Sequence, residues 1–285
     1  MNLKEDNKAV YLIIILTCIF LSLSHSLYQV AINGGLTISE IVKYPEPLSP
    51  MKYYYYNSWT LLHQFSQILL TFGFSVDNSS RIILFLSTLC FGISSFLIVN
   101  RLTLNKYLAL VVCILMLILQ KNFGDTDYPS LIFSNQSYGM FSLALSSLIF
   151  SLILNENFKY SGFFTLLLIS IHPVIGLWIL SILIISLIIN NNKIINLDFC
   201  KGGVVGLVVT LISLLIFYNN SIEKSVFDSS LLKIYMEFWD GHRNRLGILH
   251  YEYLIKTLFL FIIINTYYFF KKNKQNNLFI FFLNL

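Results

Sequence analysis

Most carboxylates of this chain gather in three polar stretches that lie between long apolar segments. Carboxylates serve as general bases and as ligands of hard cations, so stretches that collect them are candidates for a site. These acids are Glu40, Glu46 and Asp77 within residues 29–80, Asp125 and Asp127 within 121–137, and Glu223, Asp228, Glu237, Asp240 and Glu252 within 218–252. A protein that only crosses a bilayer has no need of them, so the clustering indicates a functional site on one face.

Asp125 and Asp127 form the sharpest local motif, Gly-Asp-Thr-Asp-Tyr-Pro. Two carboxylates one residue apart in a loop bounded by glycine and proline can converge on a divalent cation such as Mg²⁺ or Mn²⁺, which prefers oxygen ligands. A solvated turn is the alternative, since the same residue types are common in turns. Glu40 and Glu46 are candidate catalytic bases, or else surface charges of a loop too long to be a simple connection.

Two further groups of residues could bind a substrate. His172 precedes Pro173 inside an apolar run, where the ring could satisfy carbonyls freed by the proline or could face a polar cavity. The other group is a polar and aromatic cluster in which arginine can bind phosphate and tryptophan can stack on a sugar ring. A basic patch near lipid phosphates is the alternative for that cluster. Its candidates are Trp239, His242, Arg243 and Arg245.

The composition is that of a membrane protein. The chain is 56% hydrophobic and 12% charged, with a mean hydropathy of +0.72, which lies outside the range of soluble globular proteins. The formal charge of +5 is spread over many connections, and we find no basic arm, zinc spacing or glycine-rich phosphate loop, so we expect no nucleic-acid partner. The four cysteines, three of them in apolar runs, indicate buried thiols and no disulfide framework.

Apolar runs of spanning length predict an all-α transmembrane bundle of about seven or eight membrane segments in a single domain, residues 1–285. Residues 59–74 repeat apolar side chains at helical spacing, which predicts an amphipathic helix on the membrane surface. His63, within it, is interpreted as a structural histidine with satisfied ring nitrogens. The predicted segments are residues 9–28, 81–99, 107–120, 138–154, 161–189, 202–217 and 253–270.

The run 161–189 is too long for one upright helix, and Pro173 interrupts it. We expect a short helix that turns back near Pro173, because Lys193 then returns to the side that carries Lys4 and Arg101. The positive-inside rule makes that side cytoplasmic. This topology places the N-terminus in the cytoplasm and all three acidic stretches outside. A single kinked helix would instead invert everything after residue 190.

The chain ends in an apolar run, residues 278–285, that is too short to span a bilayer. The sequence therefore stops inside what resembles another helix, which indicates part of a longer protein. The lack of a disulfide framework and the richness in asparagine and isoleucine favour a bacterial inner membrane.

This order of parts resembles the GT-C glycosyltransferases, polytopic enzymes that move a sugar from a polyprenyl-phosphate carrier to an acceptor on the outer face of a membrane. The resemblance covers most of the chain and is architectural: a first helix, a long acidic outer loop with a surface helix, later outer acids and a proline-broken helix. It implies roles for several residues already named. They are Glu40 or Glu46 as the base, Asp125 and Asp127 as the second acidic group with a divalent metal in some members, His172 at the polar-proline turn, and Arg243 or Arg245 at the carrier phosphate.

Two other classes of function fit the sequence as well. A transporter or flippase of a lipid-linked or amphiphilic substrate would use a broken helix near the membrane centre. Against this class, the spans are almost free of charge and we find no matching second broken helix. A non-catalytic subunit of a membrane assembly is the remaining alternative.

Overall fold

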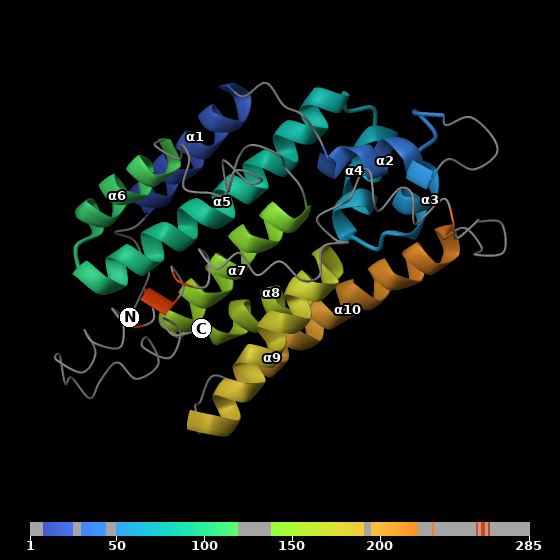
Figure 1. The fold of residues 1–285 in the computed structure, drawn as a ribbon. Helices are drawn as coiled ribbons and strands as arrows, with labels where there is room; N and C mark the ends of the chain where they lie inside the picture. The colour runs from blue at the N-terminus through green and yellow to red at the C-terminus, as the bar shows by residue number, and fades with distance from the viewer. Residues whose placement is uncertain are drawn as a thin grey trace.

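The computed structural model describes residues 8–24, 30–43, 50–118, 138–190 and 195–221, together with the isolated positions 230, 255, 258, 259 and 262. Every regular element in these ranges is a helix, so the predicted all-α class is confirmed (Figure 1). The helices are α1 (Lys8–Ser24), α2 (Val30–Ile38), α3 (Pro50–Asn57), α4 (Leu61–Thr71), α5 (Val76–Thr103), α6 (Lys106–Ile118), α7 (Tyr138–Leu154), α8 (Phe158–Ile171), α9 (Pro173–Asn190) and α10 (Leu197–Asn220).

The long helix α5 forms the centre of one half of the bundle and packs against α1, α6 and α7. α1 runs antiparallel to it. The Tyr11 ring lies edge-on against Phe96 with centroids 5.7 Å apart, whereas Cys18, farther along α1, contacts Thr88, which comes earlier in α5. α6 follows α5 after a tight turn and packs back along it. The start of α1 and the turn between α5 and α6 therefore lie at the same end.

The apolar run 161–189 folds as a hairpin. α8 ends at Ile171, His172 is extended with φ −147° and ψ 96°, and α9 begins at Pro173. α9 lies back against α8 so closely that a Cβ on Gly176 would come within 2.6 Å of the Ile169 Cα. In a continuous helix two residues seven positions apart are separated by roughly 10 Å along the axis. The turn-back that the proline predicts is therefore the conformation of this segment.

α8 and α10 run parallel and pack through glycine. Gly202 and Gly206 of α10 face the backbone of Lys159 and Phe163 in α8, and a Cβ on either glycine would collide with a carbonyl oxygen there. Farther along, the Thr210 hydroxyl donates a hydrogen bond to an α8 carbonyl at 2.8 Å. This Gly-x-x-x-Gly spacing lets the backbones of membrane helices approach closely. Because residue numbers rise together in the two helices, α10 begins at the end where α8 begins.

Basic side chains collect at this end of the bundle. The turns after α5 and α7 meet there, with Arg101 and Glu156 3.8 Å apart and the Asn155 amide donating a hydrogen bond to the Leu97 carbonyl at 3.4 Å. The basic residues of the described connections at this end are Lys8, Arg101, Lys106, Lys159 and Lys201. Of the charges from which the sequence predicts one common side, Arg101 lies at this end, whereas Lys4 and Lys193 lie outside the described residues.

Helices α2, α3 and α4 form a cap at the opposite end, beside the end of α10 (Figure 1). The predicted amphipathic helix is present as α4, with its polar side turned inward and part of its apolar side exposed. Its polar residues His63 and Ser66 are buried, whereas Ile68 and Phe72 are 49% and 79% exposed. The reason is α2, a helix that the sequence pattern did not predict, which packs along the polar side of α4.

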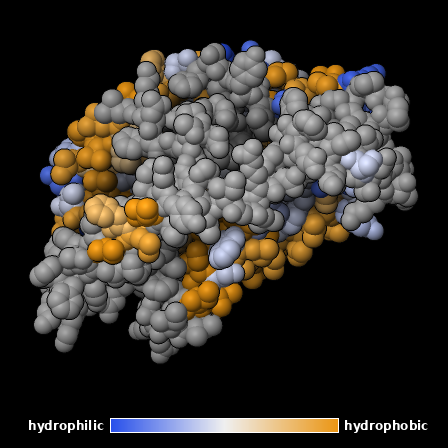
Figure 2. Space-filling model, in the orientation of Figure 1, coloured by the Kyte–Doolittle hydropathy of each residue, from blue (hydrophilic) through white to orange (hydrophobic). Residues whose placement is uncertain are grey.

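The bundle is apolar on its outside and carries small polar residues inside. Leucine, isoleucine, valine and phenylalanine are exposed along α1, α6, α9 and α10, and Figure 2 shows such residues over the α1–α6 edge and along α10. The buried faces hold serine, threonine and glycine beside leucine, isoleucine and phenylalanine, as where Ser94 of α5 hydrogen-bonds Ser147 of α7. Long rows of exposed apolar side chains are uncommon on soluble monomers.

Two of the described helices, α5 and α10, are long and apolar enough to cross a membrane. α1 and α7 have 17 residues each, which at ~1.5 Å per residue is ~26 Å, somewhat less than a ~30 Å hydrocarbon core. The predicted bounds of the fourth segment, 138–154, match α7. Lys193 and most of the predicted segment 253–270 lie outside the described residues.

Candidate functional site

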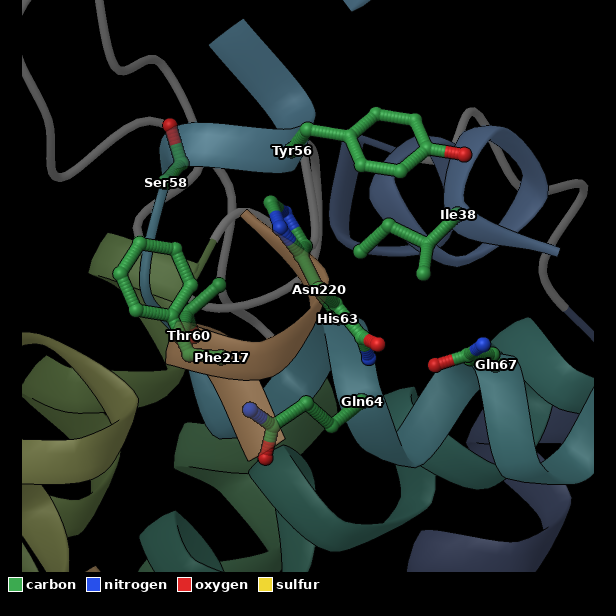
Figure 3. Close-up of a pocket in the computed structure, with 9 residues that line it drawn as sticks. All are labelled: Ile38, Tyr56, Ser58, Thr60, His63, Gln64, Gln67, Phe217 and Asn220. Atoms are coloured by element: carbon green, nitrogen blue, oxygen red, sulfur yellow. The ribbon is translucent and has the colours of Figure 1, made fainter. Parts of the chain in front are cut away.

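A pocket opens at the cap end, where α2, α4 and the end of α10 meet (Figure 3). It is shallow and partly open to solvent, and the enclosed space has room for about one water molecule. Most of its lining side chains are polar and uncharged. They are Ile38, Tyr56, Ser58, Thr60, His63, Gln64, Gln67, Phe217 and Asn220.

Hydrogen bonds fix the α4 wall of the pocket to α8 and α10. Thr60 caps α4: its hydroxyl accepts from the Leu62 N–H at 3.3 Å and donates to the Ile171 carbonyl, the last residue of α8, at 2.7 Å. The Gln64 amide donates to the Ser213 carbonyl of α10 at 2.7 Å, and the Trp59 indole donates to the Ser213 hydroxyl at 3.1 Å. These hydrogen bonds hold α4, the end of α8 and α10 together on one side of the pocket.

Glycine sets the distance between α2 and α4. The His63 ring packs directly on Gly34, and Ser66 packs on Gly35; a Cβ on either glycine would collide with these side chains. The pair of glycines is therefore required for α4 to bury its polar face against α2. Glycine has a low helix propensity. The two glycines are therefore the reason why helix propensity does not predict α2.

His63 and Gln64 carry buried polar atoms with no hydrogen-bond partner. Both ring nitrogens of His63 and the Oε1 of Gln64 are in this state, in side chains that are 1% and 7% exposed. Burial lowers the pKa of His63 to about 4, against a smaller opposing effect of the Ser58 backbone, so the ring is neutral at pH 7. An unsatisfied buried polar group costs about 1–3 kcal/mol. The burial of His63 agrees with its interpretation as a structural histidine, whereas the satisfaction of both ring nitrogens stays a prediction, since only the Ser58 backbone acts on the ring as a hydrogen-bond partner.

Contacts between aromatic rings connect His63 to the break between α8 and α9. The Tyr138 ring lies between the two histidines, with centroids 6.0 Å from His63 and 5.4 Å from His172, and its hydroxyl is 2.6 Å from that of Tyr54. His172 is half-buried, and its Nδ1 accepts from the Ile175 N–H at 3.3 Å. His172 therefore caps the start of α9 and stands next to the pocket wall without lining the pocket.

Glu40 lies beside the pocket, on the turn that ends α2. It is exposed and has φ 57°, the left-handed conformation that commonly ends a helix. Burial and then the Glu40 carboxylate raise the pKa of Tyr56, a lining residue, while Lys52 lowers it. The carboxylate is thus near enough to act electrostatically on the pocket wall. Leu104 and Glu156 share the left-handed conformation, so the backbone alone does not single out Glu40.

The remaining predicted site residues lie outside the described residues: Glu46, Asp125, Asp127, Trp239, His242, Arg243 and Arg245. The residues that flank their segments are described, however. Residues 44–49 come between α2 and α3, residues 119–137 end at Tyr138, and the third acidic stretch follows Asn220. All of these flanking points lie at the cap end. Among the described residues no group of three or more His, Cys, Asp or Glu side chains could hold a metal ion.

No family model, no curated protein and no solved structure matches this chain. The argument for a site therefore rests on the geometry of the pocket and on the residues around it.

Proposed function

We propose that this chain is an integral membrane protein of the glycosyltransferase type, with the cap end on the extracytoplasmic side. The apolar outside of α1, α6, α9 and α10 suits a hydrocarbon solvent, and α5 and α10 have spanning length. Serine and glycine at the helix contacts are typical of helices that associate in lipid. In this proposal the bundle has seven or eight membrane segments, as the sequence predicts.

The orientation follows from the charges of the two ends. Lys8, Arg101, Lys106, Lys159 and Lys201 share the end opposite the cap, against Lys43, Lys52 and Arg81 at the cap end, and short basic connections face the cytoplasm. The N-terminus is then cytoplasmic, and the pocket faces outward. We place the protein in a bacterial inner membrane, in line with its composition.

The proposed reaction transfers a sugar from a polyprenyl-phosphate carrier to an acceptor. Glu40 or Glu46 would accept the proton of the acceptor hydroxyl, the oxygen would form a bond to the anomeric carbon, and the polyprenyl phosphate would leave with the electrons of the broken bond. Asp125 and Asp127 would hold a divalent cation, Mg²⁺ or Mn²⁺. His172, Trp239, His242, Arg243 and Arg245 are the proposed substrate contacts, the arginines at the carrier phosphate.

One observation supports this proposal most. The pocket, Glu40 and three described residues next to acid-bearing stretches, Pro50, Tyr138 and Asn220, lie at a single end of the bundle. A single aqueous site could therefore collect carboxylates from three distant parts of the chain. Glu156 and Asp198 lie at the opposite end, each within 4 Å of a basic side chain.

A pair of matched glutamates tests the reaction. Glu40→Gln removes the proposed base, whereas Glu156→Gln makes the same change at an exposed residue of the opposite end that has the same left-handed backbone. Purified protein in liposomes is assayed for transfer from a polyprenyl-phosphate sugar. We expect Glu40→Gln, alone or with Glu46→Gln, to lower transfer by at least about a hundredfold, and Glu156→Gln to retain it. Full transfer by the double variant, or movement of the carrier without transfer in the wild type, would contradict the proposal.

A further inference from the structure

Arg81 is a partly buried arginine in the second turn of α5, at the cap end of the bundle. Its Nε is enclosed without a hydrogen-bond partner, whereas its two Nη atoms are not enclosed and make no hydrogen bond to any residue that the structure describes. A guanidinium that loses part of its hydration without gaining a counter-charge is costly. An anion from outside the described chain would supply the missing counter-charge at the open Nη atoms.

The described acids do not neutralise Arg81. Asp77 is the nearest of them along the chain, one turn earlier on the same face of α5, and it is exposed. No carboxylate of the described residues comes within 4 Å of Arg81, although Arg101 and Lys201 each have such a partner. An exposed pair of Asp77 and Arg81 would in any case contribute little, because water screens it.

The spacing of the two arginines of α5 sets the depth of Arg81 in a membrane. Arg101 follows Arg81 by 20 residues, which at ~1.5 Å per residue is ~30 Å along the helix, and the hydrocarbon core is ~30 Å thick. None of the residues 82–100 is charged. The two arginines therefore mark the two edges of the hydrocarbon, where long basic side chains reach the lipid headgroups. Arg101 has Glu156 3.8 Å away at its edge, and Arg81 has no acid at the other.

The face of α5 around Arg81 changes from polar to apolar towards the membrane centre. Asp77, one turn before Arg81, is exposed, whereas Phe85, one turn after it, is half-buried and apolar. A ligand with its charge on Arg81 would therefore have an aromatic ring on its hydrocarbon side. A guanidinium binds phosphate through two parallel hydrogen bonds. A phosphate carried on a hydrocarbon chain matches this arrangement, and a free phosphate ion uses only half of it.

We propose that Arg81 binds the phosphate group of a membrane lipid in the leaflet at the cap end. The phosphodiester of a headgroup and the phosphate of a polyprenyl carrier share this chemistry. The inference rests on the membrane placement of α5 in the proposed function and does not depend on the transfer reaction. Arg243 and Arg245, the proposed contacts of the carrier phosphate, lie outside the described residues, so Arg81 is a separate phosphate contact.

Lipid binding is measured by native mass spectrometry on the purified full chain in a neutral detergent. The probes are phosphatidylglycerol, a polyprenyl phosphate, inorganic phosphate, and diacylglycerol with the acyl chains of the phosphatidylglycerol. We expect saturable binding of at least one lipid phosphate, and binding of diacylglycerol and of inorganic phosphate that is at least about tenfold weaker. The tighter of the two lipid phosphates identifies the source of the bound group. Equal binding of diacylglycerol or inorganic phosphate, or no saturable binding of either lipid phosphate, would overturn the inference.

Three variants assign the contact to Arg81. Arg81→Gln removes the charge, Arg81→Lys keeps the charge without the planar fork, and Lys43→Gln removes an exposed charge at the same end of the bundle. We expect Arg81→Gln to weaken binding of the lipid phosphate by at least about tenfold and Arg81→Lys by about threefold. Lys43→Gln should bind as the wild type does.

Wild-type affinity in both Arg81 variants would overturn the inference. An equal loss in Arg81→Gln and Lys43→Gln would also overturn it, because binding would then be a general attraction to the charge of this end. If Arg81→Gln does not fold, the comparison of Arg81→Lys with Lys43→Gln decides in the same way.

These outcomes are separable from the proposed reaction. Transfer activity in a protein whose lipid binding does not depend on Arg81 would overturn the lipid site and leave the reaction in place. Binding of phosphatidylglycerol that depends on Arg81, in a protein without transfer activity, would support the lipid site and overturn the reaction.

Discussion

At the scale of single residues, His63 is the side chain on which most observations converge. It fills the gap left by Gly34, stacks edge-on with Tyr55 at 5.7 Å and with Tyr138 at 6.0 Å, and lines the pocket. Its ring nitrogens are buried without a hydrogen bond of good geometry, although the Ser58 backbone acts on the ring. Natural proteins rarely leave buried polar atoms without a partner, so the packing around His63 is a constraint on α4 that local sequence does not explain.

The buried imidazole makes stability depend on pH. Because the folded-state pKa of about 4 lies below the ordinary value of 6.5, the unfolded chain binds more protons between these values, and stability falls as pH falls from about 6.5 towards 4. We expect the free energy of unfolding to drop by about 2 kcal/mol between pH 7 and pH 5.

His63→Phe serves as the comparison for this titration. The variant keeps the other four histidines, so the difference between the two proteins isolates His63. Denaturant unfolding in detergent at several pH values provides the measurement. Equal pH slopes for the wild type and the variant would mean that His63 titrates normally and is not desolvated.

At the scale of elements, glycine positions determine which helices touch. Gly202 and Gly206 allow α10 to reach the backbone of α8, and Gly34 and Gly35 allow α2 to cover the polar side of α4. The α8–α10 contact positions Ser213, to which Trp59 and Gln64 are hydrogen-bonded. Loss of that contact would therefore disturb the pocket from a distance.

Alanine at two neighbouring glycines of α10 tests this packing. A Cβ at Gly206 would collide with the Phe163 carbonyl, whereas a Cβ at Gly203 would find its nearest atom, in Leu166, at 3.7 Å. We expect Gly206→Ala to lower the midpoint of thermal unfolding, at a cost of about 1–3 kcal/mol. Gly203→Ala should be neutral or stabilise by up to about 1 kcal/mol. The opposite order of the two variants would refute the parallel register of α8 and α10.

The sequence predicts the apolar elements better than the cap. The bounds of α7 and the hairpin at Pro173 follow from apolar run length and proline chemistry, and the structure confirms both. The sequence did not predict α2 because Gly34 and Gly35 resemble helix-breaking residues, although in the structure they are the positions at which α2 contacts α4. The burial of His63 was missed because it depends on α2 and α10, and no local pattern around residue 63 encodes those partners. Gly-x-x-x-Gly in α10 was the one available signal for the helix contact.

At the scale of the whole molecule, the two ends of the bundle differ in chemistry. The pocket, Glu40 and the flanks of the acidic stretches lie at one end, and the basic turns lie at the other. The proposed function requires that a membrane separates these ends. The α10 helix extends from the basic end to the cap end. Cys200 is exposed near its start and Asn220 is exposed at its end, and the two are roughly 30 Å apart at ~1.5 Å per residue.

Labelling of α10 at its two ends by a membrane-impermeant maleimide tests this requirement most directly. Cys18, Cys90 and Cys113 are replaced by alanine, and intact cells expressing either the native Cys200 or the pair Cys200→Ser with Asn220→Cys are compared with opened cells. We predict that Asn220→Cys is labelled in intact cells and that Cys200 is labelled only after the membrane is opened. Labelling of Cys200 from outside, with protection of position 220, would place the pocket in the cytoplasm and contradict the account.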